Sequence, residues 1–200
     1  MNNDNSSKQI LLSVLGVAIL VVAVVGISFA AFSYSKTGTT SNTITTGTIT
    51  MSYTEPTNGI NLTNALPITD TAGKALKGDN NTFDFTVGAT ISGTTEINYV
   101  ITAVKGDGCT VADSGVKVYL TDQDDSQILA PTKVSALTKT VAGNNAGAPA
   151  DQFILKTGTY SATSTDSYRL RMWVADDYTA PATAEKYVLK VNVYGQANAQ

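Results

Sequence analysis

Hydrophobic residues run without interruption near the start of the chain, and after that run they alternate with polar residues. The run, residues 10–32, reads ILLSVLGVAILVVAVVGISFAAF and contains no charged residue. Its stretch at 10–27 comes close to the ~20 apolar residues with which a helix crosses a bilayer. A buried core helix with a solvated side would show a polar face, and the run has none. The pattern therefore predicts one N-terminal apolar helix, which is either a signal peptide or a membrane anchor.

The end of the run is compatible both with cleavage as a signal peptide and with retention as a membrane anchor. Ser28 and Ala30 place small residues at the two positions that a signal peptidase reads, which predicts cleavage between Ala30 and Ala31. The run is longer than an ordinary h-region of roughly 7–15 residues, which favours a retained anchor instead. Lys8 precedes the run and only Asp4 opposes it, so the N-terminus is expected to be cytoplasmic and the remainder exported.

Beyond the run, apolar residues recur with the period of two that is typical of half-buried strands. The threonine-rich stretch at 33–48 favours extended chain but has few large apolar residues with which to fold alone. Residues 97–104 carry apolar side chains on both faces, so this strand is expected to be central. Strands are predicted at 49–53, 83–91, 97–104, 116–120, 133–137, 153–155, 160–162, 167–174 and 187–194, with a short strand and a loop within 60–78 and a flexible surface loop at 142–150.

No later stretch has a convincing helical period, so the chain is expected to be all-β. Strands punctuated by turn residues predict a single β-sandwich of jelly-roll or immunoglobulin-like form, preceded by the one apolar helix. The expected organisation is a signal peptide or anchor at 1–30, a threonine-rich extended segment at 31–54, the sandwich at 55–195 and a polar tail at 196–200.

Composition narrows the function. The chain has no histidine, which removes the commonest general base and zinc ligand and disfavours enzymes, although carboxylate pairs remain conceivable. The net charge is −3 with or without residues 1–30, and 14% of the chain is charged, which argues against nucleic acid as a partner. Cys109 is the single cysteine, so no intramolecular disulfide forms, and a half-buried small residue is its expected role.

Three groups of residues invite a chemical interpretation. Arg169, Arg171 and Trp173 share one face of the strongest predicted strand; they are expected to form its solvent side, with surface contact to a sugar or neighbouring subunit as the alternative. Asp122 and its neighbours resemble a calcium loop, but Gln127 and Lys133 stand where glycine and glutamate would be required. The adjacent carboxylates at 176 and 177 point to opposite faces of an extended chain. No catalytic, cofactor-binding or metal-binding residue is therefore assigned.

Several stretches resemble a known family. The run that ends Ser28-Phe29-Ala30-Ala31-Phe32-Ser33, followed by Thr46-Gly47-Thr48-Ile49-Thr50-Met51, resembles the TasA and camelysin family of exported Gram-positive surface proteins. The stretch INLTNALP at 60–67 is similar to the family's NLSNLKPGD motif, and Phe83-Asp84-Phe85 lies where the next strand of the family begins. The strand at 187–194 occupies a similar terminal place. The likeness covers roughly residues 10–90 and this last strand.

The resemblance implies a jelly-roll subunit of extracellular biofilm-matrix fibres, in which each copy lends its N-terminal segment as a strand to its neighbour. The segment at 31–53 corresponds to that donor strand. The implied partners are other copies of the chain or a related matrix subunit, the signal peptidase, and the membrane before processing. The implied location is outside a Gram-positive cell, or on its surface if residues 1–30 are retained. Camelysin is described as a metal-dependent protease, but without histidine or a ligand motif that activity is not expected here.

A second hypothesis from a different class stays open. The chain would be a membrane-anchored surface sandwich that binds a cell-wall polymer, a carbohydrate or a host surface through Trp173, Tyr178 and Tyr194. An enzyme that uses carboxylates such as Asp122, Asp124, Asp176 and Asp177 ranks third.

Overall fold

A computed structural model describes residues 33–37, 42–46, 49–57, 60, 65–78, 80–92, 95–179 and 185–198, with the backbone alone at 33–49. The apolar run at 10–32 lies outside these residues, and so do the expected cleavage positions Ser28, Ala30 and Ala31. Within the part that the structure describes, no helix is long and apolar enough to cross a membrane.

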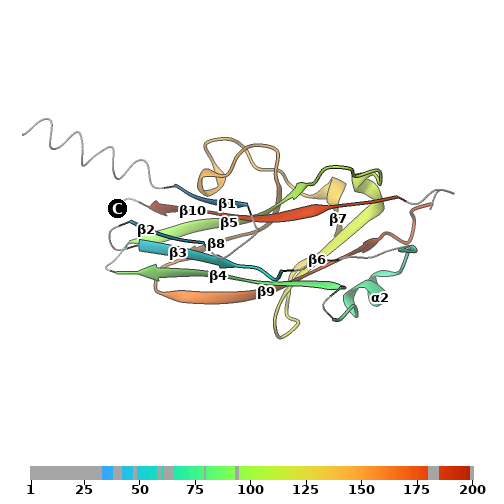
Figure 1. The fold of residues 1–200 in the computed structure, drawn as a ribbon, viewed down its shortest axis with the longest axis horizontal. Coiled ribbons are helices and arrows are strands. Elements are labelled where there is room, and N and C mark those ends of the chain that lie inside the picture. Colours follow the sequence, from blue (N-terminus) through green and yellow to red (C-terminus); the bar gives the residue numbers. More distant parts are fainter. Residues whose placement is uncertain are drawn as a thin grey trace, which may run out of the picture. The chain divides into compact units, whose positions relative to one another are not determined.

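The described chain forms two antiparallel sheets with very little helix (Figure 1). The four-stranded sheet has the order β1-β10-β5-β8, and the six-stranded sheet has the order β2-β3-β4-β9-β6-β7. The strands are β1 (Ser33–Thr37), β2 (Asn42–Thr46), β3 (Ile49–Thr54), β4 (Thr82–Ile91), β5 (Glu96–Lys105), β6 (Val116–Asp122), β7 (Gln127–Lys133), β8 (Phe153–Tyr160), β9 (Ser164–Val174) and β10 (Leu189–Asn198). These two sheets confirm the expected all-β architecture.

The core lies between the two sheets. Alternate residues of each strand point inward, as the period of two predicts, and Met51, Val87, Ile97, Ile101 and Val193 are fully buried. Tyrosines join the sheets through their hydroxyl groups, which must find partners when the ring is buried. The hydroxyl oxygens of Tyr99 in β5 and Tyr168 in β9 lie 3.0 Å apart, and Tyr160 in β8 donates to the carbonyl of Val87 in β4 at 2.9 Å.

Most of the predicted strands are confirmed, but the strands expected separately at 153–155 and 160–162 are one strand, β8, and the strand expected at 133–137 is misplaced. β5 is central in its sheet, as its two apolar faces indicated. The strand expected at 133–137 lies earlier, as β7, and is followed by the 3-10 turn η2 (Val134–Ala136). The described part of 60–78 contains the short helix α2 (Asp70–Lys74), which the sequence did not predict, and residues 61–64 of the expected strand and loop lie outside the described residues. The Thr69 side chain caps this helix by accepting from the Ala72 amide at 3.4 Å, and Asp70 suits its first turn.

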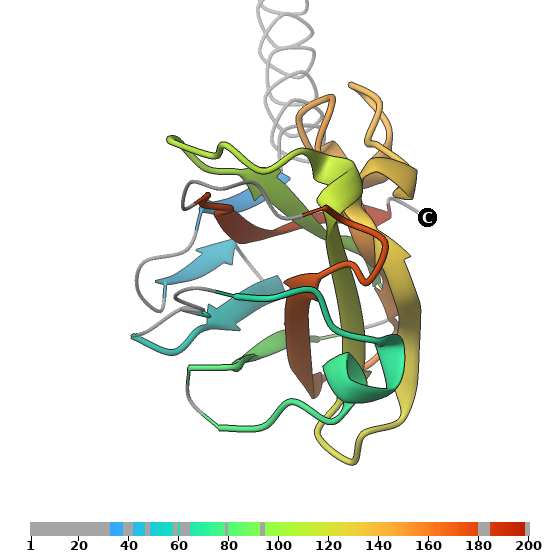
Figure 2. The same cartoon turned by 90° about the vertical axis from the view of Figure 1, so that its right-hand side faces the viewer.

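Each sheet is partly covered on its outer face. α2 and its flanking residues lie beside β9 of the six-stranded sheet (Figure 2). On the other sheet, the turn η3 (Asn145–Gly147) lies against β1, β5 and β10. The loop at 142–150 lies at the surface, as its composition indicated, and Ala148 anchors it to the sheet: this residue is 2% exposed and contacts Val100 and Tyr194.

The edges of the two sheets differ in regularity. β1 and β2 form one edge of each sheet, and β8 and β7 form the other. β7 contains Pro131, which has no amide proton to donate, and its pairing with β6 shifts register at two places. The pairing of β8 with β5 also shifts, between Ile101 and Thr102. Such irregularities disfavour further strand pairing at an edge.

Candidate functional site

The threonine-rich segment lies along both sheets of its own chain. β1 pairs antiparallel with β10, from Ser33 opposite Gln196 to Thr37 opposite Asn192. β2 pairs antiparallel with β3, from Asn42 opposite Tyr53 to Thr46 opposite Ile49. The N-terminal segment thus supplies one edge strand to each sheet, β1 to the four-stranded sheet and β2 to the six-stranded sheet.

The two strands that receive this segment face each other across the core. A Cβ atom placed on Gly195 of β10 would collide with the side chain of Met51 in β3, so the Met51 side chain packs directly on the backbone of Gly195. Met51 and Tyr53 are fully buried, as is Val193 of β10. We call β3 and β10 together the acceptor edge. Without β1 and β2, both strands would expose unpaired main-chain groups beside this apolar core.

The structure corrects the interpretation of Arg171 and Trp173 as solvent-facing residues. Their side chains are 1% and 2% exposed, because α2 and its flanking residues cover this part of β9. A Cβ at Gly73 of α2 would collide with the Trp173 ring, so only glycine permits this close packing. Neither Arg171 nor Trp173 is available as a surface contact.

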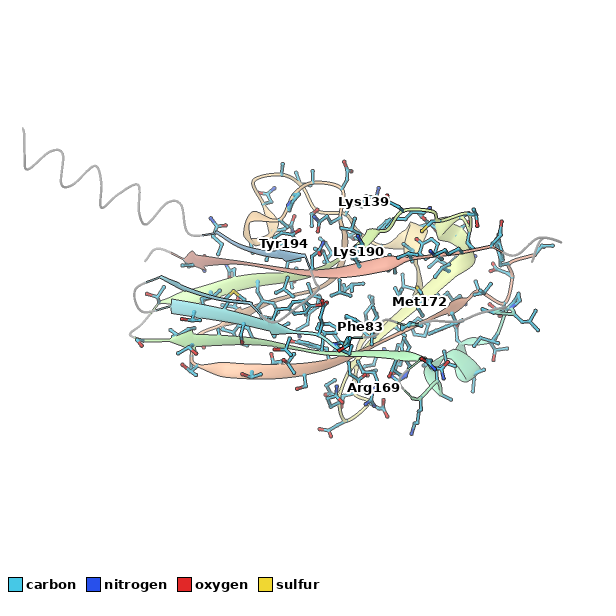
Figure 3. The ribbon with its side chains drawn as sticks, in the orientation of Figure 1. Phe83, Lys139, Arg169, Met172, Lys190 and Tyr194 are labelled. Carbon is cyan, nitrogen blue, oxygen red and sulfur yellow. The ribbon has the colours of Figure 1, made fainter. Side chains whose placement is uncertain are left out.

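Arg169 alone of the three reaches solvent. Its side chain is 22% exposed and binds Asp84 of the neighbouring strand through two donors, Nε at 2.9 Å and Nη2 at 2.7 Å (Figure 3). Arg171 instead donates from Nη2 to Asp125 at 2.5 Å and from Nε to the Leu76 carbonyl at 2.8 Å. The arginines therefore tie β9 to its neighbours and to the covering segment.

The other candidate contacts are occupied within the chain. Tyr194 is 2% exposed and accepts a hydrogen bond from Gln152 Nε2 at 2.9 Å. Tyr178 is half-buried, lies against Gly115 and donates to Glu185. Cys109 is half-buried as expected, since its Sγ donates to the Gly106 carbonyl at 3.1 Å and accepts from the Val188 amide at 3.1 Å.

The carboxylates that sequence singled out have separate partners. Asp176 binds Lys117 at 3.2 Å, whereas Asp177 binds Lys133 at 2.6 Å. Asp122 Oδ1 accepts from the amides of Asp124 and Ser126 at 2.9 and 2.8 Å, which is the geometry of an ordinary Asx turn. Among the described residues, no group of three or more carboxylate, cysteine or histidine side chains is placed to hold a metal ion.

The Arg169–Asp84 and Arg171–Asp125 pairs make the stability of the fold depend on pH in the acid range. The hydrogen bond from Arg169 lowers the pKa of Asp84, and the hydrogen bond from Arg171 lowers the pKa of Asp125. A lowered folded-state pKa stabilises the fold fully above the unfolded-state pKa of ~3.9 and loses that contribution as the pH falls below it.

We therefore expect the urea midpoint to be steady from neutral pH to about pH 5 and to fall below about pH 4. The double variant Asp84→Asn, Asp125→Asn should show a shallower fall. An equal slope in the variant and the parent would assign the acid sensitivity to other carboxylates.

Comparisons with known proteins identify no relative from which a function could be inferred. No family model, no curated protein and no solved structure matches the chain. The acceptor edge, with the N-terminal segment on it, is the feature from which a function can be argued.

Proposed function

We propose that the chain is an extracellular structural subunit that polymerises by donor-strand addition, as a fibre component of a biofilm matrix or cell surface. In this proposal, strands β1 and β2, from the threonine-rich segment at 31–54 of one copy, supply the pairing that completes the acceptor edge of the next copy. The proposal assigns the sandwich to the jelly-roll form, with the immunoglobulin-like form as its alternative, and places it outside a Gram-positive cell. Release from the membrane by a signal peptidase precedes assembly.

The observation that carries the proposal is that one N-terminal segment pairs with both sheets on the same side of the core. Main-chain hydrogen bonds supply the affinity in strand addition, and they are the same whether the strand comes from the same chain or from another. The concentration of subunits and the conformation of the connecting residues then decide between the two arrangements. Donation of an N-terminal strand is also what the resemblance to the TasA and camelysin family implies.

Within the segment, β1 is the part best suited to exchange. Two residues, Gly47 and Thr48, separate β2 from β3, and glycine at the first position of a two-residue loop favours a tight hairpin. Four residues, GTTS at 38–41, separate β1 from β2 and would serve as the hinge. β1 can thus leave β10 of its own chain while β2 stays paired with β3.

The alternative of a carbohydrate-binding or host-binding surface sandwich loses its main support. It relied on Trp173, Tyr178 and Tyr194 as contacts; Trp173 and Tyr194 are 2% exposed, and of the three only Tyr178 is partly exposed.

Removal of the donor segment tests the proposal. Deletion of residues 31–48 from the exported chain should abolish polymerisation, measured by light scattering and electron microscopy. The deleted chain should keep its far-ultraviolet circular dichroism, because β3–β10 retain the paired core of both sheets.

The matched control keeps β1 and changes only the hinge. A chain in which residues 38–41 are replaced by a glycine-serine linker of equal length should still assemble. Filaments that persist after deletion of residues 31–48 would refute the donor-strand mechanism.

A further inference from the structure

A buried polar cluster lies on the outer face of the four-stranded sheet, next to the loop that carries η3. Its members are Thr102 of β5, Gln152 before β8, and Asn192 and Tyr194 of β10, which are 0%, 9%, 1% and 2% exposed. Figure 3 labels Tyr194 on this side of the molecule. Buried polar groups are expected to be hydrogen-bonded, so each atom of the cluster should have a partner.

Gln152 is at the centre of the cluster. Its Oε1 accepts from Thr102 Oγ1 at 2.6 Å and from Asn192 Nδ2 at 3.4 Å. Its Nε2 donates to the Tyr194 hydroxyl at 2.9 Å. These bonds occupy the Thr102 hydroxyl proton and both ends of the Gln152 amide.

The side-chain carbonyl of Asn192 takes part in none of these hydrogen bonds. Within the described part of the chain, Asn192 Oδ1 is buried and no hydrogen-bond donor reaches it. Because this oxygen is buried, a strand that carries a suitable donor would gain the bond that is missing.

The position of Asn192 in the sheet shows where a donor can come from. On one side Asn192 is opposite Thr102, whose proton is already engaged by Gln152. On the other side it is opposite position 37, the last residue of β1. The strand that occupies the β1 position is therefore the neighbour in the sheet that can bring a donor to Oδ1. Opposite residues in an antiparallel pair are close enough for such a bond.

We propose that Asn192 determines the specificity of strand addition, by accepting a hydrogen bond from the hydroxyl at position 37 of a strand donated by a second copy of this chain. The source of the strand, a second copy of the chain, rests on the proposed function. The role of Asn192 in setting the register of the strand does not. The strand at 33–37 reads SYSKT and is a short, polar strand whose register the hydrophobic effect specifies weakly.

The sequence of the segment suits this role. Residues 33, 35, 37 and 39 all carry hydroxyl groups, whereas Lys36 and Gly38 do not. A shift by one residue would place Lys36 or Gly38 opposite Asn192 and leave Oδ1 without its hydroxyl donor. A shift by two residues would bring Ser35 or Thr39 there, so Thr37→Val should release the strand into such a shifted register.

Cross-linking measures the register directly. In chains that begin at Ala31 and carry Cys109→Ser, the pair Ser33→Cys and Gln196→Cys reports the observed register, because these positions are opposite each other. The pair Ser33→Cys and Asn198→Cys reports the register in which Thr39 is opposite Asn192. The two cysteines are placed on separate chains, which are mixed under a mild oxidant, and also on one chain. Covalent products are quantified on non-reducing gels.

We expect Thr37→Val to lower the ratio of the 33–196 product to the 33–198 product about tenfold, the order that one buried hydrogen bond supplies. Thr37→Ser, which keeps the hydroxyl, should leave the ratio unchanged. Thr43→Val is the matched control, because it removes a hydroxyl of the same segment that pairs opposite Ser52. In an Asn192→Leu background, Thr37→Val should have no further effect.

The outcomes separate the two proposals. A ratio that Thr37→Val leaves unchanged overturns the role of Asn192, whether the product forms between chains or within one chain. Products that form only within one chain overturn donation from a second copy, and a tenfold response to Thr37→Val would then assign the register role to the chain's own strand. Absence of both products in every combination overturns the pairing of this segment with β10, and both proposals with it.

Discussion

Trp173→Ala is expected to lower the free energy of unfolding by about 3–5 kcal/mol, the usual cost of removing a large buried aromatic side chain. The ring is 2% exposed and packs against α2 at Gly73, so its loss leaves a cavity and also frees the covering segment. For a domain of this size, the midpoint of thermal unfolding should fall by roughly 6–20 °C. Circular dichroism during urea and heat denaturation measures both quantities.

Trp173→Phe is the matched control and should cost clearly less, because it keeps an aromatic ring in the same space. The pair of variants also distinguishes a core tryptophan from a binding tryptophan. Stability that is unchanged in Trp173→Ala would contradict the burial of the ring and would return this residue to the list of surface contacts.

Arg171→Met should be the next most damaging single change, with an expected loss of about 2–3 kcal/mol. The substitution removes the donors to the Leu76 carbonyl and to Thr121 Oγ1, which lie 2.8 and 3.2 Å from Nε and Nη1. It also leaves Asp125 with only its longer ion pair to Arg169, at 3.8 Å. Because the Asp125 side chain is 46% exposed, water compensates part of that loss, which holds the effect below that of a fully buried pair.

Arg169→Met on the same strand provides the comparison. Arg169 and Asp84 are both partly exposed, at 22% and 38%, and such pairs typically contribute about 1 kcal/mol or less. Denaturation of the two variants in urea should therefore show a clear order, with Arg171→Met the less stable. Equal losses would mean that the covering segment does not depend on Arg171.

The alternation of apolar residues predicted most of the sandwich because burial between two sheets imposes a period of two. The strands at 83–91, 97–104 and 167–174 are found within one to three residues of their observed limits. The prediction of 133–137 was wrong because Val134 and Leu137 are buried from a 3-10 turn and the residue after it, where spacing resembles neither a strand nor a helix.

The second face of β9 was misjudged for a different reason. Arginines that alternate with apolar residues normally face water, and only the covering segment reverses this. That segment has a helix of five residues, too short for a hydrophobic period, and its contact with Trp173 depends on the absence of a side chain at Gly73. Local sequence patterns do not carry that information.

The candidate site was predicted in part. Threonine enrichment indicated that the N-terminal segment is extended, and it pairs with two sheets. Asn192 was overlooked because it alternates with Val191 and Val193, and a polar residue at such a position normally faces solvent. The one available signal was Tyr194, a large side chain on the same face that needed cover; the loop at 142–150 provides it from a distant part of the sequence.

The irregular edges at β7 and β8 limit the shape of the assembly that the proposed strand addition would form. Pro131 and the shifts of register leave those two strands poor templates, so regular strand addition is confined to the side of β3 and β10. A subunit with one receptive side and one donated arm has a valency of two. In the proposed assembly, such subunits join in one dimension with a defined polarity, and the expected product is an unbranched thread in place of a sheet or gel.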